Sequence, residues 1–177
     1  MPLADLTAAH IAAQQGSFEP QRGNNALVRF DIDPEGLLVF AVSTFPLPKL
    51  HNEPLELQYL NETRKFAGAH TVDDMDFTFT DYIDNPVALK LLSWYQRVFD
   101  LYNGKIGLAR NYKSRGDLTL YGPNGEFDRR WELIGCWPSS FDAGDIDMSS
   151  GEPVKINMTI TIDKAIPADG LDAGVRL

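Results

Sequence analysis

The sequence is poor in cysteine, in basic residues and in long hydrophobic runs. Its single cysteine, Cys136, cannot form a disulfide within the chain, so the fold does not depend on an oxidising compartment. Sixteen basic against 25 acidic residues give a formal net charge of −9, which disfavours tight binding to nucleic acid or to anionic membrane. No run approaches the ~18 apolar residues of a membrane span, and Met1–Gly16 lacks a signal-peptide pattern. We therefore expect neither a membrane-spanning segment nor a signal peptide.

The length predicts one domain, residues 1–177, large enough to bury roughly 70% of its unfolded surface. We expect an N-terminal arm over residues 1–24, with a short helix from Asp5 to Ala13, and a C-terminal tail over residues 164–177.

Alternation of apolar and polar residues predicts several half-buried strands. Lys155–Asp163 is the clearest: its even positions are apolar and its odd positions polar, so one face packs and the other meets water. Met75, Phe77 and Phe79 alternate with polar residues in the same way. The segments 117–121 and 130–137 flank an Asn-Gly turn, which predicts a hairpin.

Two further segments are expected to form a hairpin near the N-terminus. Ala26–Ile32 alternates, and Leu37–Val42 is continuously apolar, as in a strand covered on both faces. The turn residues Asp33–Gly36 lie between them. The total is about six antiparallel strands, a mainly-β sandwich or barrel.

The segment 46–70 departs from this pattern because three prolines interrupt it, although it keeps many apolar residues. We interpret it as a long protruding loop that acts as an interaction arm, since loops above roughly 12–15 residues are usually functional or disordered.

One long amphipathic helix is predicted over about 86–102, with Pro86 in its first turn and Gly104 as its stop. Its core stripe is expected to run from Ala88 through Leu91, Leu92 and Tyr95 to Tyr102, with Val87, Trp94 and Leu101 widening the apolar surface.

No arrangement of reactive side chains indicates an enzyme, a metal or a cofactor. His10, His51 and His70 have no metal-pair spacing, and Cys136 lies in a strand, where a thiol is usually buried and inert. The acidic turn Asp142–Asp147 lacks the ligand spacing of a calcium-binding EF-hand loop. Asp73, Asp74 and Asp76 likewise lack the pocket that an acid/base pair needs, and we interpret them as a polar surface.

Several segments resemble the tail tube protein of contractile-tailed bacteriophages (myoviruses), over nearly the whole chain. The similar segments are Thr7–Phe30, Tyr59–Gly68 with its continuation to Met75, Glu132–Ser140 (ELIGCWPSS), Gly144–Asp147 and Val154–Asp163.

This resemblance implies a subunit whose hexameric rings stack into the inner tail tube, a conduit for DNA ejection with an anionic lumen, located in the virion and assembled in the host cytoplasm. The implied partners are other copies of the chain, the tail sheath protein, the baseplate tube initiator and the tail terminator. The tape measure protein and genomic DNA would lie inside the lumen, and no membrane is involved.

The resemblance and the residue pattern together place three surfaces. The expected inter-ring contacts are Leu47, Leu50, Leu57, Tyr59, Asn61, Glu62, Arg64, Lys65 and Phe66. The expected lumen residues are Asp74, Asp76, Thr78, Asn157, Thr159 and Thr161, and the expected outer surface of the helix carries Lys90, Gln96 and Arg97.

Two alternatives stay open. One is the inner-tube protein of a tailocin or a type VI-like injection system, which uses the same fold. The other is a monomeric small-molecule-binding β-barrel that closes around an apolar cavity. The segment 46–70 favours a stacking subunit, because a self-contained barrel has little use for a long arm.

Overall fold

The computed structural model describes residues 21–168 except 85, 124, 126 and 150. The predicted helix Asp5–Ala13 and most of the expected N-terminal arm lie outside these residues. The expected C-terminal tail begins with a strand, Lys164–Pro167, rather than an extension from the body.

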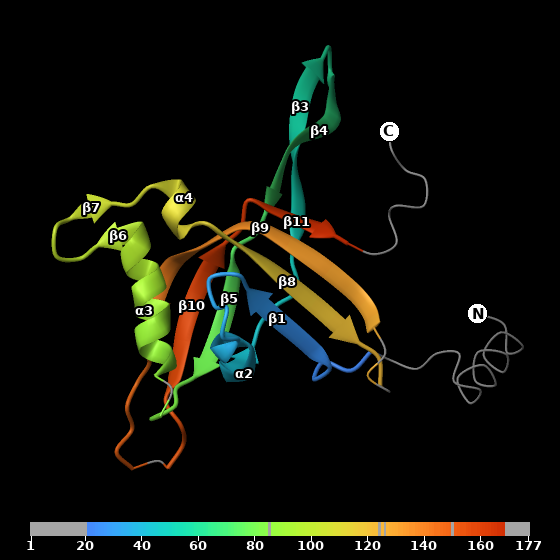
Figure 1. The fold of residues 1–177 in the computed structure, drawn as a ribbon. Coiled ribbons are helices and arrows are strands. Elements are labelled where there is room, and N and C mark those ends of the chain that lie inside the picture. The colour runs from blue at the N-terminus through green and yellow to red at the C-terminus, as the bar shows by residue number, and fades with distance from the viewer. Residues whose placement is uncertain (1–20, 85, 124, 126, 150, 169–177) are drawn as a thin grey trace, which may run out of the picture.

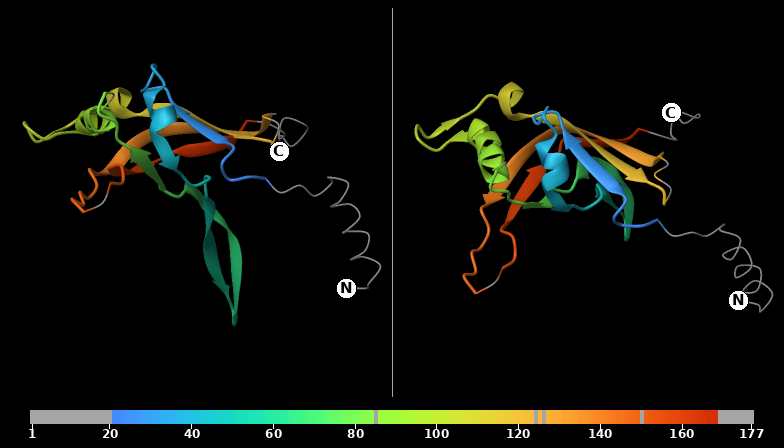
Figure 2. Two further views of the ribbon diagram at one scale, coloured as in Figure 1. Left: turned by 90° about the horizontal axis from the view of Figure 1, so that it is seen from below. Right: turned by 60° about the horizontal axis from the view of Figure 1, so that its bottom comes forward.

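A curled antiparallel sheet forms the body, so the expected mainly-β class is confirmed (Figures 1 and 2). Its order is β1-β8-β9-β10-β5-β2, with β11 also paired to β9, which makes seven strands against the predicted six. The strands are β1 Ala26–Phe30, β2 Val42–Thr44, β5 Met75–Thr80, β8 Ser114–Tyr121, β9 Phe127–Asp142, β10 Lys155–Thr161 and β11 Lys164–Pro167.

The long strand β9 joins the two halves of the sheet. Its first part pairs with β8 and β11, and its second part pairs with β10. Gly135, at φ 73°, lies between the two parts, and a Cβ atom there would come within 2.2 Å of the Asp163 carboxylate. Only glycine fits this bend, because other residues are strained at positive φ and would collide with Asp163.

The alternating segments supply the core as predicted. Met75, Phe77 and Phe79 are buried on one face of β5, and the even residues of β10 are buried beside them. The rings of Phe30 and Phe77 meet edge to face at 5.5 Å, and Phe30 lies 5.5 Å from Trp94 of the covering helix. One face of the sheet therefore packs and the other remains polar.

The covering helix α3 spans Val87–Val98 and is shorter than predicted. Its buried residues are Leu91, which belongs to the predicted core stripe, and Val87 and Trp94, which were expected to widen the apolar surface beside that stripe. The chain leaves the helix at Phe99 to form a small hairpin, β6 Phe99–Asp100 with β7 Lys105–Ile106. Tyr102, expected in the core, is 91% exposed on that hairpin.

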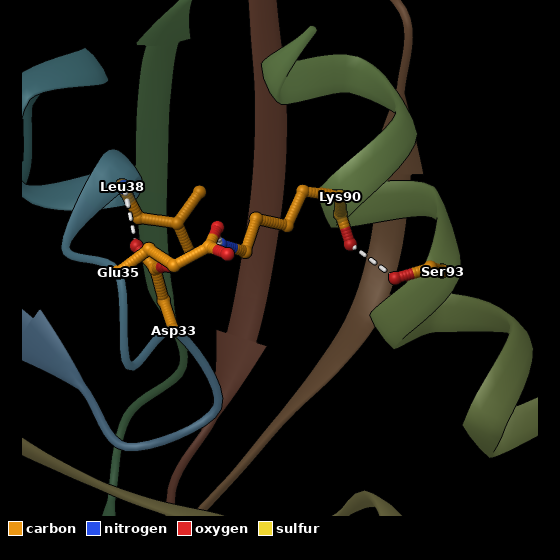
Figure 3. Close-up of polar contacts among 5 residues, drawn as sticks. All are labelled: Asp33, Glu35, Leu38, Lys90 and Ser93. Carbon is orange, nitrogen blue, oxygen red and sulfur yellow. Dashed lines mark hydrogen bonds and ion pairs between the residues drawn. The ribbon is translucent and has the colours of Figure 1, made fainter. Parts of the chain in front are cut away.

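The predicted hairpin near the N-terminus is wrong. Leu37–Ala41 is a short helix, α2, and β1 pairs with β8 instead. Gly36 adopts a left-handed φ of 74°, and the backbone N–H of Leu38 donates to Asp33 Oδ2 at 2.6 Å, which turns the chain into the helix (Figure 3). The residues after α2 form β2, which pairs with β5.

The segment expected as a loop is a regular two-stranded hairpin that projects from the body (Figure 1). It consists of β3 Leu50–Tyr59 and β4 Glu62–Val72. Pro54 lies at a register shift in β3, where a bulge tolerates its missing N–H. A short helix α4, Ala109–Tyr112, completes the elements. Among the described residues, no helix has the length and hydropathy required to cross a membrane.

Candidate assembly surfaces

The hairpin of β3 and β4, here called the arm, presents two different faces to solvent. The cross-strand pairs Leu55–Phe66, Leu57–Arg64 and Tyr59–Glu62 alternate with polar pairs such as Glu56–Lys65. Because opposite residues in an antiparallel ribbon point to the same side, the arm has one largely apolar face and one polar face.

The apolar face is exposed along its length. Leu55, Leu57 and Phe66 are between 52% and 54% exposed, and Tyr59 is 63% exposed. The Arg64 guanidinium lies 5.1 Å from the centre of the Tyr59 ring, a cation–π contact that leaves the leucines uncovered. On the polar face, Lys65 and Glu56 form an exposed ion pair at 2.8 Å. An isolated two-stranded ribbon of this kind is only marginally stable in water.

Eight of the nine residues expected to make inter-ring contacts lie in the arm, all of them exposed. The exception, Leu47, precedes β3 and lines a groove in the body. Sequence reasoning missed Leu55, which continues the alternation of Leu57 and Tyr59, and Leu60, which forms the arm tip with Asn61.

The polar face of β5 and β10 brings together the residues expected to face a lumen. Thr159 Oγ1 donates to Asp76 Oδ1 at 2.7 Å, and Thr78 Oγ1 donates to Asn157 Oδ1 at 3.0 Å. Both bonds join residues that are directly opposite in the β5–β10 register. The result is a ladder of short polar side chains.

The same face continues onto the second part of β9. Asp142 pairs in register with Asn157, and both are exposed beside Asp76. Thr161 is half-buried opposite Trp137, and Asp74 lies just before β5, at the rim of a shallow pocket that Phe45 also lines. The central part of the face therefore carries carboxylates and neutral hydroxyl and amide groups, and the basic Lys155 lies at the end of β10.

The helix residues expected on the outer surface do not share one environment. Gln96 is half-buried and Arg97 is exposed. Lys90 crosses to the turn before α2, where its ammonium group donates to Asp33 and, at 2.9 Å, to Glu35 (Figure 3). Desolvation lowers the pKa of Lys90, but the two carboxylates outweigh it and the net pKa is raised. Lys90 is thus an internal link between α3 and the β1–α2 turn.

The groups weighed for catalysis lie apart. His51 and His70 are on the arm, where His70 Nδ1 is 2.7 Å from Asn52 Oδ1, and His10 lies outside the described residues. Burial, with the nearby Asp163 carboxylate, raises the pKa of Cys136 to about 12, so its thiol stays protonated. Within the described ranges, no group of three or more histidine, cysteine or acidic side chains is placed to hold a metal.

A groove runs between the two edges of the curled sheet. The edge strands β1 and β2 do not pair with each other, so the described strands form a half-barrel that stays open along this side. Apolar side chains of Ala26, Phe45, Leu47 and Leu120 line the groove, and Arg129 lies at its rim. Sequence periodicity gave no signal for it, because its residues come from four separate segments.

A half-barrel of this topology, with one covering helix and a projecting hairpin, is the fold of tube proteins from phage tails and contractile injection systems. A chain of the anti-feeding prophage tube-terminating cap has a TM-score of 0.65 at 12% identity, covering 85% of this chain and 91% of that one. A chain of the sheath-tube complex of the extracellular contractile injection system PVC has a TM-score of 0.64 at 12% identity, covering 88% and 95%.

A phage structure shows the same likeness. The SPP1 tail tube matches with a TM-score of 0.55 at 11% identity, over 84% of this chain and 78% of that one. No family model matches the chain, and the search of curated proteins finds no match. The resemblance to tail tube proteins inferred from the sequence is thus confirmed at the level of the fold.

Proposed function

We propose that the protein is a structural subunit of a tail tube, in which hexameric rings of identical copies stack into a hollow cylinder. The observation that carries this proposal is the arm, whose apolar face is exposed in the single subunit. A head-to-tail interface that closes by rotation gives a ring, and an arm that reaches the next ring gives a filament. The unpaired edges of β1 and β2 supply further backbone groups for contact between copies.

The polar ladder of β5 and β10 suits the wall of the channel. Carboxylates such as Asp76 and Asp142 repel phosphate, and short neutral side chains offer DNA no cationic site at which to stop. In this proposal the lumen is anionic and conducts DNA, with the tape measure protein inside before ejection. The sheath protein lies outside, against the exposed side of α3 near Arg97, and the baseplate initiator and terminator lie at the ends. The tube belongs to the virion tail and is assembled in the host cytoplasm.

Assembly is tested by shortening the arm without disturbing its base. Joining Leu55 to Phe66 through an Asn-Gly turn keeps these paired residues in register and removes the outer half of the arm. Negative-stain microscopy of the purified protein should show rings or tubes, and the shortened variant should remain folded but form none. The matched control is Glu56→Ala with Lys65→Ala, which removes only the exposed ion pair of the polar face. Unaltered tubes from the shortened variant contradict the role of the arm.

The lumen is tested by labelling introduced thiols in assembled tubes. Thr78→Cys should react with a small maleimide but slowly with one attached to a large polymer, whereas Arg97→Cys should react with both. Cys136 adds no background, because its pKa of about 12 keeps it protonated and its side chain is buried. Equal access of the large reagent to both positions places the β5–β10 ladder outside the channel.

An inner tube of a phage-derived injection system is the second candidate, favoured by the similarity to chains from two such systems. The presence of DNA within tubes isolated from cells distinguishes a phage tail tube from the inner tube of an injection system. A monomeric binding barrel is disfavoured because the described strands do not close around a cavity.

A further inference from the structure

The arm ends in a turn that its sequence makes unfavourable. Leu60 and Asn61 form a two-residue connection between the paired residues Tyr59 and Glu62. Leu60 has a φ of 57°, and it is the only residue other than glycine with a positive φ in the part of the chain that the structure describes. Glycine is the usual choice at such a position, because a side chain there collides with its own backbone.

The Leu60 side chain has no contact within the subunit that compensates for this strain. It is 90% exposed, more than any other leucine of the arm. A strained backbone that holds a large apolar side chain in water points to a contact made elsewhere. Figure 1 and the left view of Figure 2 show the tip far from the body.

We propose that Leu60 of one copy inserts into the groove between β1 and β2 of a second copy. This inference rests on the proposed function and identifies the contact that the arm makes. The groove is the apolar recess described above, lined by Phe45, Leu47 and Leu120, and it is large enough to receive a leucine side chain. Side chains that fill well-packed, desolvated pockets carry most of the binding energy of an interface.

The arm tip cannot fill the groove of its own subunit. Phe45 and Leu47 lie at the base of the arm, and the ten residues of β3 place the tip about 30 Å away. The occupant that we propose is therefore the arm tip of a second copy, which offers charge complementarity. Glu62 lies next to the tip, and Arg129 lies at the rim of the groove in an exposed ion pair with Asp128 at 3.1 Å. Such a pair is weak and can exchange partners.

The first test separates an effect on the contact between copies from an effect on folding, because replacing Leu60 should weaken assembly without lowering the stability of the subunit. Leu60→Gly removes the side chain and relieves the strain, so the melting temperature of the isolated subunit should stay the same or rise. Assembly should weaken, with the critical concentration for tube formation raised at least about tenfold. Leu60→Met should restore assembly, and Gln58→Ala on the polar face should leave it unchanged. Unchanged assembly of Leu60→Gly overturns the proposal.

The second test locates the groove. Leu60→Cys combined with Leu47→Cys should give a ladder of disulfide-linked multimers after treatment with copper phenanthroline as the oxidant. Leu60→Cys combined with Arg97→Cys should give none. If wild-type tubes form and the shortened arm abolishes them, but no ladder appears, the groove assignment is wrong while the proposed function stands. If the wild-type protein forms no rings at any concentration, the proposed function itself fails.

Discussion

The ion pair between Lys90 and Asp33 links α3 to the β1–α2 turn, and its removal gives the sharpest stability prediction. Asp33 is 2% exposed, and its carboxylate accepts from Lys90 and from the Leu38 N–H (Figure 3). Lys90→Met keeps the aliphatic stem but leaves a buried negative charge with one donor. Breaking a buried pair costs about 3–5 kcal/mol. Because the Lys90 side chain is 24% exposed, we expect a cost at or just below the lower limit of that range, about 2–3 kcal/mol.

Urea unfolding of the unassembled subunit measures this cost. Lys65→Met is the matched control, since the Lys65–Glu56 pair is more than half exposed on both sides and should contribute less than about 1 kcal/mol. Adding Asp33→Asn to Lys90→Met removes the unpaired charge while keeping an acceptor for Leu38, so it should recover most of the loss. Equal effects of Lys90→Met and Lys65→Met would refute the role assigned to Asp33.

The pH dependence has a definite sign. The pKa of Lys90 is raised in the folded state above its ordinary value of 10.5. The contribution of the pair is therefore complete below pH 10.5 and is lost as the pH rises through the folded pKa. The stability difference between the wild type and Lys90→Met should be constant near neutral pH and should shrink only in strongly alkaline buffer.

Three further changes probe the core and the sheet bend. Trp94→Ala should cost about 3–5 kcal/mol in urea unfolding, and Trp94→Phe clearly less, because the ring is 1% exposed. Gly135→Ala should lower stability by at least about 2 kcal/mol, because the residue has a positive φ and the new Cβ would collide with Asp163. A Cβ at Gly23 meets open space, so Gly23→Ala should leave stability unchanged in the same urea unfolding experiment. Cys136 should resist iodoacetamide at pH 8 until urea unfolds the protein, as followed by mass spectrometry; rapid labelling of the native state would contradict its burial.

One-sided burial explains which strands could be predicted. In β5 and β10 one face packs and the other meets water, so the apolar positions repeat every two residues in the sequence. The Leu37–Ala41 run has no such period, and an apolar run of that length fits a buried strand or a buried helix. The run becomes a helix through the turn at Gly36 and the bond from the Leu38 N–H to Asp33, and Lys90 holds Asp33 from 57 positions away. The alternation of apolar and polar residues shows neither contact.

The arm was predicted as an element but not as a hairpin. Its prolines resembled loop residues, yet two precede β3 and Pro54 occupies a register shift that needs no ladder hydrogen bond from it. Leu60 was not predicted because the feature that distinguishes it is its positive φ angle, which the pattern of residues does not show. For the lumen candidates, alternation alone places Asp76, Thr78, Asn157 and Thr159 on one face of their strands, and antiparallel pairing of β5 with β10 brings them together. That this face lines a channel stays a prediction.

The arm residues proposed to assemble the subunit are separate from its core, whereas the proposed receiving groove is lined by Leu120 of the core and by Phe45, which packs against the core. The core comes from the sheet, α2 and α3, and no residue of the arm belongs to it apart from the partly buried Val72 at its base. The body can therefore fold alone, while a two-stranded ribbon such as the arm is only marginally stable in water. In the proposed assembly, binding to a second copy would bury the apolar face of the arm, so the arm would gain stability only as the concentration of subunits rises. Assembly would then depend on a few residues at the tip.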